Sequence, residues 1–450
     1  MTESSSKDPS TQRAPQRPLR RWRVAARDGV WLQESASNPM LINSVFVCDR
    51  MPLETFQELW RQRIMTENRY PRFQRRVVRG RFFSWWQEDP EFELERHIFL
   101  APPLVDDPDA LRTREQFQGY LSGEATKPLP DDRPLWQIQF IENFRENRSA
   151  LYVRIHHVMA DGMSLLPVVF SLMDHAEGDE EKMEQAKKLV AKPPNSFLVV
   201  LKTILLGPLL LLQKMLWKAD RNVLHGPPVQ GQKRVAWTPP IDIKRVKDVK
   251  NAYGTSLNDI LMTALAAAFE RYARDHGAPL ETLRMSMPVN VRASSEEPKM
   301  ENKFAAVMLD LPVGYTEPRA HAKAMNEYLS HIKSSVEPLF TYGTVLVLLT
   351  ALPASLSRAL IDWLANKCTN VVSNVPGPQH AVYLAGYQIR SMMFWVPQRA
   401  NIAVGVSMIS FDGRLSLGII ADSAIVPDPQ ELVDNFCLEF QRLREEVGVA

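Results

Sequence analysis

Cysteine is scarce in this chain, whose 450 residues include only Cys48, Cys368 and Cys437. Because their number is odd and their spacing is wide, they form neither a disulfide framework nor a paired cysteine metal site. A small disulfide-stapled domain is therefore excluded. The composition suits a reducing compartment in which all three residues are free thiols.

An excess of charge of one sign is also missing. Lys and Arg number 54 against 52 Asp and Glu, a net charge of +2, and no long basic stripe is interleaved with aromatic residues, so we expect no nucleic-acid partner. Residues 1–21 lack the apolar stretch of a secretory signal and predict a disordered basic tail. The arginines in and next to this region either contact anionic lipid headgroups or are simply solvated. They are Arg13, Arg17, Arg20, Arg21 and Arg23.

No apolar run is long and uninterrupted enough for a confident membrane span, which takes roughly 20 apolar residues. In the strongest run, residues 197–217, Lys202, Gln213 and Lys214 interrupt the apolar side chains and Gly207-Pro208 breaks the centre. We expect a kinked helix that lies on a membrane surface or over a hydrophobic entrance. An ordinary buried helix and a true span are the alternatives.

The chain is too long for one ordinary core, so we expect two domains. Hydrophobic residues make up 45% and charged residues 24% of the sequence, which is typical of a globular protein. The expected domains are residues 22–174 and 235–450, and residues 175–234 form a charged linker and the apolar helix between them. Strands mixed with helices in both halves predict an α/β (α+β) two-domain fold.

Periodicity predicts the elements of the first half. Residues 135–141 and 151–157 alternate as strands do, and the polar residues 142–149 suit a hairpin between them. Residues 164–173 predict a helix with Ser164 as N-cap and Pro167 in its first turn.

The second half has equally clear local patterns. Residues 257–274 predict an amphipathic helix with Ser256 as N-cap, and residues 427–445 predict a helix that closes the chain. The pair Asp412-Gly413 predicts a hairpin. Strands are expected at residues 283–292, 305–311, 369–373, 402–411 and 414–421.

The most informative segment is the run from His156 to Gly162, in which two histidines, three small or apolar residues and Asp161-Gly162 lie between a predicted strand and a predicted helix. Imidazole suits a general base near neutral pH. Adjacent strand residues point to opposite faces, so His156 and His157 cannot both face one substrate or share a metal, and we expect no metal site. The spacing alone does not choose between them. Since no Gly-x-Ser-x-Gly elbow is present, no serine nucleophile is expected.

This run resembles the HHxxxDG motif of the acyl-CoA-dependent acyltransferases that share the chloramphenicol acetyltransferase fold. The resemblance implies an active-site tunnel at the domain interface, with His157 as general base and His156 in support. It also gives Asp161 a structural ion pair with an arginine of the other domain, for which Arg292 is the candidate. Gly162 is expected to permit a tight turn and close backbone approach.

Further segments resemble the bacterial and plant wax ester synthase/diacylglycerol acyltransferases over nearly the whole chain. They are Asn38-Pro39-Met40, Pro134-Leu135-Trp136, Ser256-Leu257-Asn258-Asp259, the segment 287–292, Ser373-Asn374-Val375-Pro376-Gly377-Pro378 and the segment 381–386. The Asp-Phe-Gly-Trp-Gly segment of the soluble plant acyltransferases is absent, which leaves open how coenzyme A is held.

Most of these segments have a structural interpretation beside the functional one. Pro134, Leu135 and Trp136 either contact substrate or begin a buried strand, and Asn258 and Asp259 either contact substrate or start a helix. Ser373 and Asn374 either donate hydrogen bonds to the oxyanion or hold a strand crossover.

The resemblance implies transfer of a fatty acyl group from acyl-CoA to a long-chain alcohol or diacylglycerol, which gives a wax ester or triacylglycerol. No cofactor is expected, since acyl-CoA is a substrate. The expected location is cytoplasmic, at the surface of a membrane or lipid droplet. The alternatives are a condensation enzyme that takes acyl groups from a carrier protein, and a noncatalytic lipid-binding protein of the same fold.

Overall fold

The computed structural model describes residues 19–66, 69–81, 83–107, 109–145, 147–174, 205, 209–210, 212–292, 299–335 and 337–449. Most of the apolar run 197–217 and of the expected tail 1–21 therefore lies outside the described residues. Arg21, expected in the tail, begins strand β1 instead.

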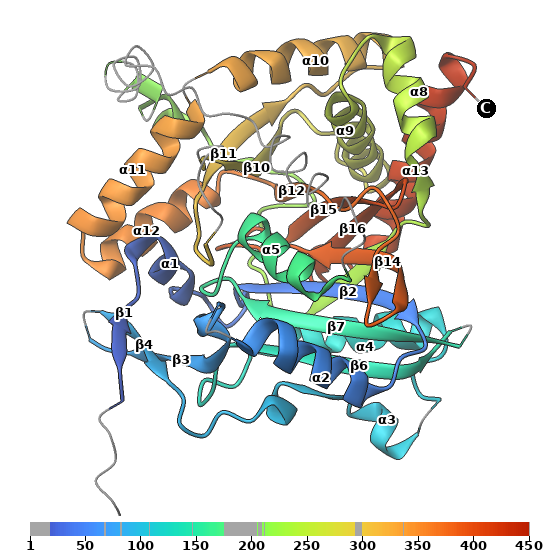
Figure 1. Cartoon of the computed structure of the whole chain (residues 1–450). Helices are drawn as coiled ribbons and strands as arrows, with labels where there is room; N and C mark the ends of the chain where they lie inside the picture. Colours follow the sequence, from blue (N-terminus) through green and yellow to red (C-terminus); the bar gives the residue numbers. More distant parts are fainter. Residues whose placement is uncertain are drawn as a thin grey trace, which may run out of the picture.

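Two large sheets lie one above the other in the view of Figure 1. The lower, six-stranded sheet has the order β13-β14-β2-β7-β6-β5. Its strands are β2 (Leu41–Asp49), β5 (Ile98–Leu100), β6 (Trp136–Phe144), β7 (Arg148–His156), β13 (Tyr383–Leu384) and β14 (Tyr387–Trp395). The predicted β6–β7 hairpin is present, but its connection is shorter than the predicted residues 142–149, because β6 continues to Phe144 and β7 begins at Arg148.

The upper sheet follows the order β11-β10-β12-β15-β16-β8, and β9 pairs with β16. Its strands are β8 (Lys233–Trp237), β9 (Ile241–Asp242), β10 (Leu283–Asn290), β11 (Phe304–Leu311), β12 (Asn370–Pro376), β15 (Val404–Phe411) and β16 (Arg414–Asp422). The five strands predicted for the second half correspond to β10, β11, β12, β15 and β16. Asp412 and Gly413, with φ of 46° and 70°, form the predicted turn.

A small third sheet has the order β1-β4-β3. It consists of β1 (Arg21–Arg23), β3 (Arg75–Arg79) and β4 (Ser84–Glu88). Sequence patterns did not predict this sheet, because its strands are only three to five residues long and two of them are rich in arginine.

The second half of the chain contributes two strands, β13 and β14, to the lower sheet of the two-domain α/β fold. Strand β14 comes from the second half but pairs with β2 in the lower sheet. Buried residues of helix α4 (Arg114–Thr126), β8 and β14 form a common cluster that includes Phe117, Val235 and Trp395. Hydrophobic side chains therefore connect the two halves.

Helices cover the sheets, and α9 and α13 pack on each other, with α13 also against β16 and β8. The α-helices are α1 (Ala26–Gly29), α2 (Leu53–Trp60), α3 (Pro103–Asp106), α4 (Arg114–Thr126), α5 (Gly162–Leu172), α8 (Ile243–Tyr253), α9 (Leu257–Asp275), α10 (Pro318–Ser334), α11 (Glu337–Ala351), α12 (Ala354–Ala365) and α13 (Pro429–Glu446). The predicted N-cap Ser256 is confirmed by a capping box with Asp259.

Helix α5 begins earlier than predicted. Its N-cap is Asp161, whose side chain accepts the backbone N–H of Ser164, so the prediction of Ser164 as N-cap is wrong. Pro167 consequently lies inside the helix rather than in its first turn. A carboxylate is the stronger cap because it also interacts favourably with the helix dipole.

Among the described residues, no single helix is long and apolar enough to cross a membrane. One bent pair, α10 with α11, meets the requirement together by length and composition.

Candidate active site

His157 follows directly after β7, where the chain turns toward α5. Its backbone N–H donates to the carbonyl of Met40 at 2.7 Å, which extends the pairing of β7 with β2. Only 8% of its surface is exposed. The imidazole is therefore held at the end of a rigid strand.

The side chain of Asn302 fixes the tautomer of His157. Its Nδ2 donates to the carbonyl oxygen of His157 at 2.8 Å and to Oδ1 of Asp28 at 3.0 Å. Since both partners only accept, the amide orientation is determined, and Asn302 Oδ1 faces Nδ1 of His157 at 2.8 Å. Nδ1 must therefore carry the proton, which leaves the lone pair on Nε2.

Asp28 supports this arrangement from the other side of Asn302. It is fully buried, accepts the backbone N–H of Asn302 at 2.8 Å and forms an ion pair with Arg72 at 2.7 Å. Arg72 also donates to the carbonyl oxygens of Val158 and Met159 in the motif turn. The buried carboxylate of Asp28 is thus paired with a positive charge. It fixes the side-chain amide of Asn302, which in turn fixes the imidazole of His157.

Trp31 covers one face of the His157 ring. The two rings stack with centroids 3.9 Å apart, and Phe304 lies 5.8 Å from the imidazole. Burial in these surroundings lowers the pKa of His157 to about 4, because the imidazolium loses hydration. Among the described residues Nε2 has no hydrogen-bond partner. A neutral ring with an unshared nitrogen is the state that a general base requires.

His156 faces a different neighbour, as expected for adjacent strand residues. Its Nδ1 accepts the backbone N–H of Val158, so its Nε2 donates to Glu34 at 3.2 Å. Burial would raise the pKa of Glu34, but the hydrogen bond from His156, together with those from the N–H of Met40 and the side chain of Arg79, lowers it to about 2. His156 therefore ties the motif to an ionised carboxylate and supports the turn.

Asp161 forms the expected ion pair with Arg292, at 2.8 Å between Oδ2 and Nη2. The same oxygen accepts the backbone N–H of Lys303, and Arg292 also donates to Ser164 Oγ and to the carbonyl of Glu301. The segment 301–303 thus contacts both the motif aspartate and the motif histidine. This arrangement gives Asp161 a structural role and leaves the orientation of His157 to Asn302.

Gly162 does not form the tight turn expected of it, whereas close approach of its backbone to a substrate stays a prediction. It is the first residue of α5 and does not have positive φ. A Cβ at this position would lie 3.9 Å from Val375, an ordinary contact. Backbone geometry therefore does not require glycine here.

Ser373 and Asn374 lie on opposite faces of β12, since they are adjacent in a strand. Ser373 shares a face with Val375, the residue next to Gly162, and so lies on the side of the motif. Asn374 Nδ2 instead bonds Asn258 Oδ1 at 3.3 Å. The two cannot act together on one oxyanion from the same face.

Asp259 has a helix-start role in the structure. It is fully buried, completes the capping box with Ser256 and accepts a hydrogen bond from Asn326 at 2.7 Å. Asn258, its neighbour, contacts Asn374 and is partly exposed.

The structure supports the structural interpretation of Pro134, Leu135 and Trp136, all of which are buried. Trp136 is 1% exposed, stacks on Trp60 with centroids 4.9 Å apart and donates from Nε1 to the carbonyl of Phe73. A tryptophan so enclosed has no surface to offer a substrate.

Several residues of the site were not predicted from the sequence, and Asp28, Trp31 and Asn302 among them lie around His157. They come from segments without a motif, and Asp28 and Asn302 have charged neighbours typical of a solvated surface. Only the fold brings them to the histidine.

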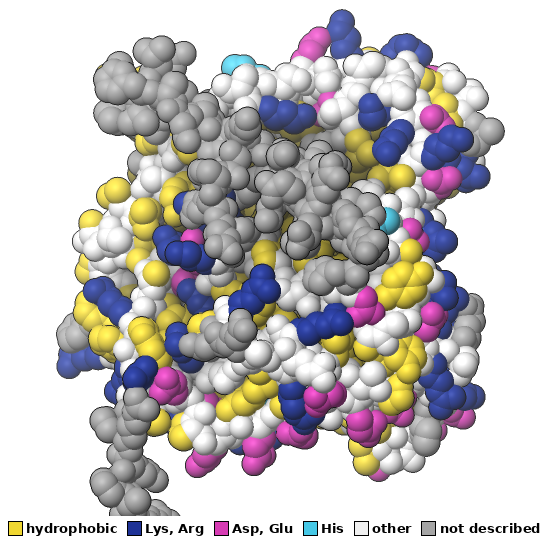
Figure 2. Space-filling view, in the orientation of Figure 1, with side chains coloured by type: hydrophobic (Ala, Val, Ile, Leu, Met, Phe, Trp, Pro, Cys, Tyr) yellow, Lys and Arg dark blue, Asp and Glu magenta, His cyan; other side chains and the backbone are white. Residues whose placement is uncertain are grey.

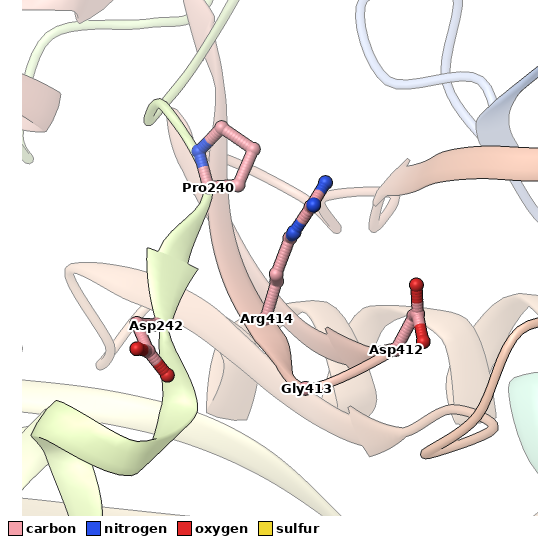
Figure 3. Close-up of a pocket in the computed structure, with 5 residues that line it drawn as sticks. All are labelled: Pro240, Asp242, Asp412, Gly413 and Arg414. Carbon is pink, nitrogen blue, oxygen red and sulfur yellow. The ribbon is translucent and has the colours of Figure 1, made fainter.

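Two surface cavities do not include the motif. The first, of about 510 Å³, is lined by Pro240, Asp242, Asp412, Gly413 and Arg414 at the β15–β16 turn (Figure 3). The second, of about 370 Å³, is lined by Arg112, Asn143, Phe144, Arg145 and Asn147. The tunnel at the domain interface therefore stays a prediction. No group of His, Cys, Asp and Glu within the described ranges could hold a metal ion.

Two family models match the chain. The wax ester synthase/diacylglycerol acyltransferase catalytic domain matches residues 25–216, and the WS/DGAT C-terminal domain matches residues 300–444. Together they cover about three quarters of the chain, and the first contains the whole motif.

Individual relatives agree with the models. A Mycobacterium tuberculosis protein named as a diacylglycerol O-acyltransferase is 25% identical over 80% of this chain and 76% of its own length. The O-acyltransferase WSD of Acinetobacter baylyi is 22% identical over 91% of this chain and 93% of its own.

Solved structures show the same fold. The wax ester synthase/diacylglycerol acyltransferase from Marinobacter aquaeolei VT8 matches with a TM-score of 0.68 at 21% identity, over 95% of this chain and 100% of that one. The starter condensation domain of rhizomide synthetase, in complex with an acyl-CoA, matches with a TM-score of 0.61 at 14% identity, over 95% and 94% of the two chains.

Proposed function

The chain belongs to the wax ester synthase/diacylglycerol acyltransferase family, and on that premise we propose that it transfers a fatty acyl group from acyl-CoA to the hydroxyl of a long-chain alcohol or a diacylglycerol. The observation that carries the proposal is the state of His157, whose Nδ1 is held by Asn302 while its Nε2 is unshared. The products are a wax ester or a triacylglycerol and free coenzyme A.

His157 performs both proton transfers. Nε2 takes the proton of the acceptor hydroxyl as its oxygen attacks the thioester carbonyl carbon. When the tetrahedral intermediate collapses, the carbon–sulfur bond breaks and the leaving thiolate takes the proton from Nε2. The ring returns to its neutral state, and no covalent acyl-enzyme forms.

The buried surroundings of His157 support both halves of this cycle. Burial keeps the resting ring neutral, with a pKa of about 4. The imidazolium formed during attack is stabilised through Nδ1–H by Asn302, whose amide donates to the carboxylate of Asp28. The His157 ring is therefore unprotonated before the reaction, and the positive charge that it gains during the reaction is stabilised.

For the oxyanion of the intermediate we assign Ser373 as a donor. Its place on the motif-facing side of β12 supports this role. Asn374 on the opposite face supports the strand through Asn258.

Substrates of this kind are insoluble, and the protein meets them at the surface of a membrane or lipid droplet. Exposed apolar side chains between residues 205 and 216 support this part of the proposal: Leu205, Leu209, Leu212, Met215 and Leu216. Lys214 among them bonds inward to Met308 and Glu337, which leaves an apolar outer face.

The experiment offers palmitoyl-CoA with hexadecanol and dioleoylglycerol in competition, follows thiol release and separates the lipids by thin-layer chromatography. Wild type is expected to form wax ester, triacylglycerol or both, and the variant His157→Ala to lose turnover. Product formation only from a carrier-protein donor, or lipid binding without any ester, would contradict the proposal.

A further inference from the structure

The small sheet β1-β4-β3 has two chemically different faces. Trp22, Trp86 and Val77 pair across its strands and pack on the core of the first half. Since neighbouring residues alternate, the opposite face presents Arg21 and Arg23 from β1 and Arg76 from β3. Strands at the two edges of a three-stranded sheet lie roughly 10 Å apart, so the guanidinium groups spread over a surface rather than converge on a point.

These three arginines have no acidic partner. None forms an ion pair among the described residues, whereas Arg72 and Arg79 pair with Asp28 and Glu34. Arg21 and Arg23 are exposed. Arg21 and Arg23 therefore carry exposed, uncompensated positive charge, whereas Arg76 is only partly exposed and Gln87 between Arg21 and Arg76 is 1% exposed.

Aromatic rings lie among these charges. Arg23 lies 3.6 Å from the ring of Phe83, which is 49% exposed, and Trp85 is directly opposite Arg23 in the sheet. Tryptophan has an apolar ring with a polar N–H and gathers at the boundary between lipid and water, which suits Trp85.

The apolar helices α11 and α12 continue this surface. Helix α1 begins three residues after β1 and contacts α11. Arg399 connects α12 to the same region, since it pairs with Asp362 at 2.7 Å and donates to the carbonyl of Val30. Figure 1 shows α11 and α12 at the left edge above β1 and β4, and Figure 2 shows hydrophobic side chains there with Lys and Arg side chains below them.

Large apolar side chains of these helices face outward, among them Val347, Leu356 and Trp363. Residues 212–217 adjoin the same helices, because Lys367 after α12 donates to the carbonyl oxygens of Lys214, Met215 and Trp217. The apolar area is thus larger than one helix and has the basic sheet along one side.

We propose that the outer face of β1-β4-β3, together with α11 and α12, docks on an anionic phospholipid surface. The inference rests on the proposed function, in which the substrates dissolve in lipid. The apolar helices enter the boundary between headgroups and acyl chains, and Arg21 and Arg23 contact phosphate groups. A site for the phosphates of coenzyme A would instead need converging cations, and the flat sheet spreads them apart.

Vesicle cosedimentation tests the proposal. The full chain is mixed with vesicles of phosphatidylcholine alone, or of equal parts phosphatidylcholine and phosphatidylglycerol. Wild type is expected to bind the anionic vesicles more tightly, and Arg21→Ala with Arg23→Ala to weaken that binding about fivefold for each arginine lost. The difference should vanish near 1 M salt, where charges are screened within about 3 Å.

Two further variants separate the contributions. Leu356→Gln with Trp363→Gln is expected to weaken binding to both kinds of vesicle. The exposed pair Arg245→Ala with Lys247→Ala, on α8 at the other side of Figure 1, is the matched control and should bind as wild type does.

A vesicle-free assay with hexanoyl-CoA and a short soluble alcohol distinguishes this inference from the proposed function. The Arg21→Ala, Arg23→Ala variant should turn over as wild type there, and absence of turnover in wild type would count against the function alone. Equal binding of wild type to neutral and anionic vesicles would overturn the docking surface. The docking surface would also be overturned if the Arg21→Ala, Arg23→Ala variant lost affinity for free coenzyme A but still bound the vesicles.

Discussion

Asn302 and His157 lie 145 positions apart in the chain and are joined by two hydrogen bonds, one to Nδ1 and one to the backbone carbonyl, each of 2.8 Å. The amide therefore holds both the ring and the backbone of the histidine. Because Asn302 is in turn held by Asp28, the orientation of the ring depends on three separate segments of the chain.

Replacing Asn302 by leucine should impair catalysis more than binding. The change removes the acceptor for Nδ1–H and leaves a buried donor without a partner, which costs about 1–3 kcal/mol, or roughly 5- to 150-fold in rate. We expect kcat to fall by this amount while KM changes little, measured by thiol release.

The variant His157→Ala provides the control for a merely structural role. It should lose about 10²- to 10⁴-fold in rate. In its background Asn302→Leu should cause little further loss, because the two residues act as a unit. Full additivity of the two losses would contradict positioning of the base by Asn302.

The pH dependence of kcat/KM should reflect the lowered pKa of His157. With a pKa of about 4, the base of the free enzyme stays neutral down to about pH 5, and the profile should be flat from there to pH 8. A fall centred near pH 6.5, the value of an unperturbed histidine, would show that the ring is hydrated in the free enzyme.

The same shift links stability to pH. Between pH 6.5 and 4 the unfolded chain binds a proton at His157 that the folded protein does not, so folding stability should decrease as pH falls through this window. Urea unfolding at pH 7 and pH 5 measures the effect. The decrease in the free energy of unfolding between the two pH values should be smaller in the His157→Gln variant.

Breaking the ion pair of Asp161 and Arg292 should destabilise the fold. Both side chains are nearly buried, and Arg292→Leu leaves Asp161 as a buried charge with only backbone donors. We expect a loss of about 3–5 kcal/mol in urea unfolding. The exposed pair of Asp49 and Arg390 is the comparison, since Arg390→Leu should change stability by less than about 1 kcal/mol.

The sequence predicted the parts of the site that are local. His157, His156 and Asp161 stand within one strand–turn–helix segment, and the family resemblance supplied Arg292 as the partner of Asp161. The residues that orient and cover the base were not predicted, because Asn302, Asp28 and Trp31 act only through tertiary contacts. A single asparagine before a strand carries no pattern that distinguishes it from a surface residue.

In the fold, too, features with a local sequence signal were predicted and features that depend on distant segments were not. Helix α9 was predicted to within one residue at each end, whereas β7 was predicted but begins three residues before its expected start. The pairing of β14 with β2 was not, since strand partners far apart in the chain leave no local signal. The cap of α5 was misplaced because both Asp161 and Ser164 are good N-cap residues, and only the geometry of the turn chooses between them.

Replacing Gly162 by alanine should leave the fold intact. The residue is at the start of α5 with ordinary helical backbone, and a Cβ would only touch Val375 at 3.9 Å. The loss of glycine entropy should stabilise the protein by up to about 0.4–1 kcal/mol, measured as a rise in Tm. Gly231→Ala is the contrasting control, since its φ of 87° and a Cβ position 2.9 Å from Ser37 Cα require a destabilised fold. A lower Tm in Gly162→Ala than in wild type would mean that the motif glycine has a backbone role which its helical conformation conceals.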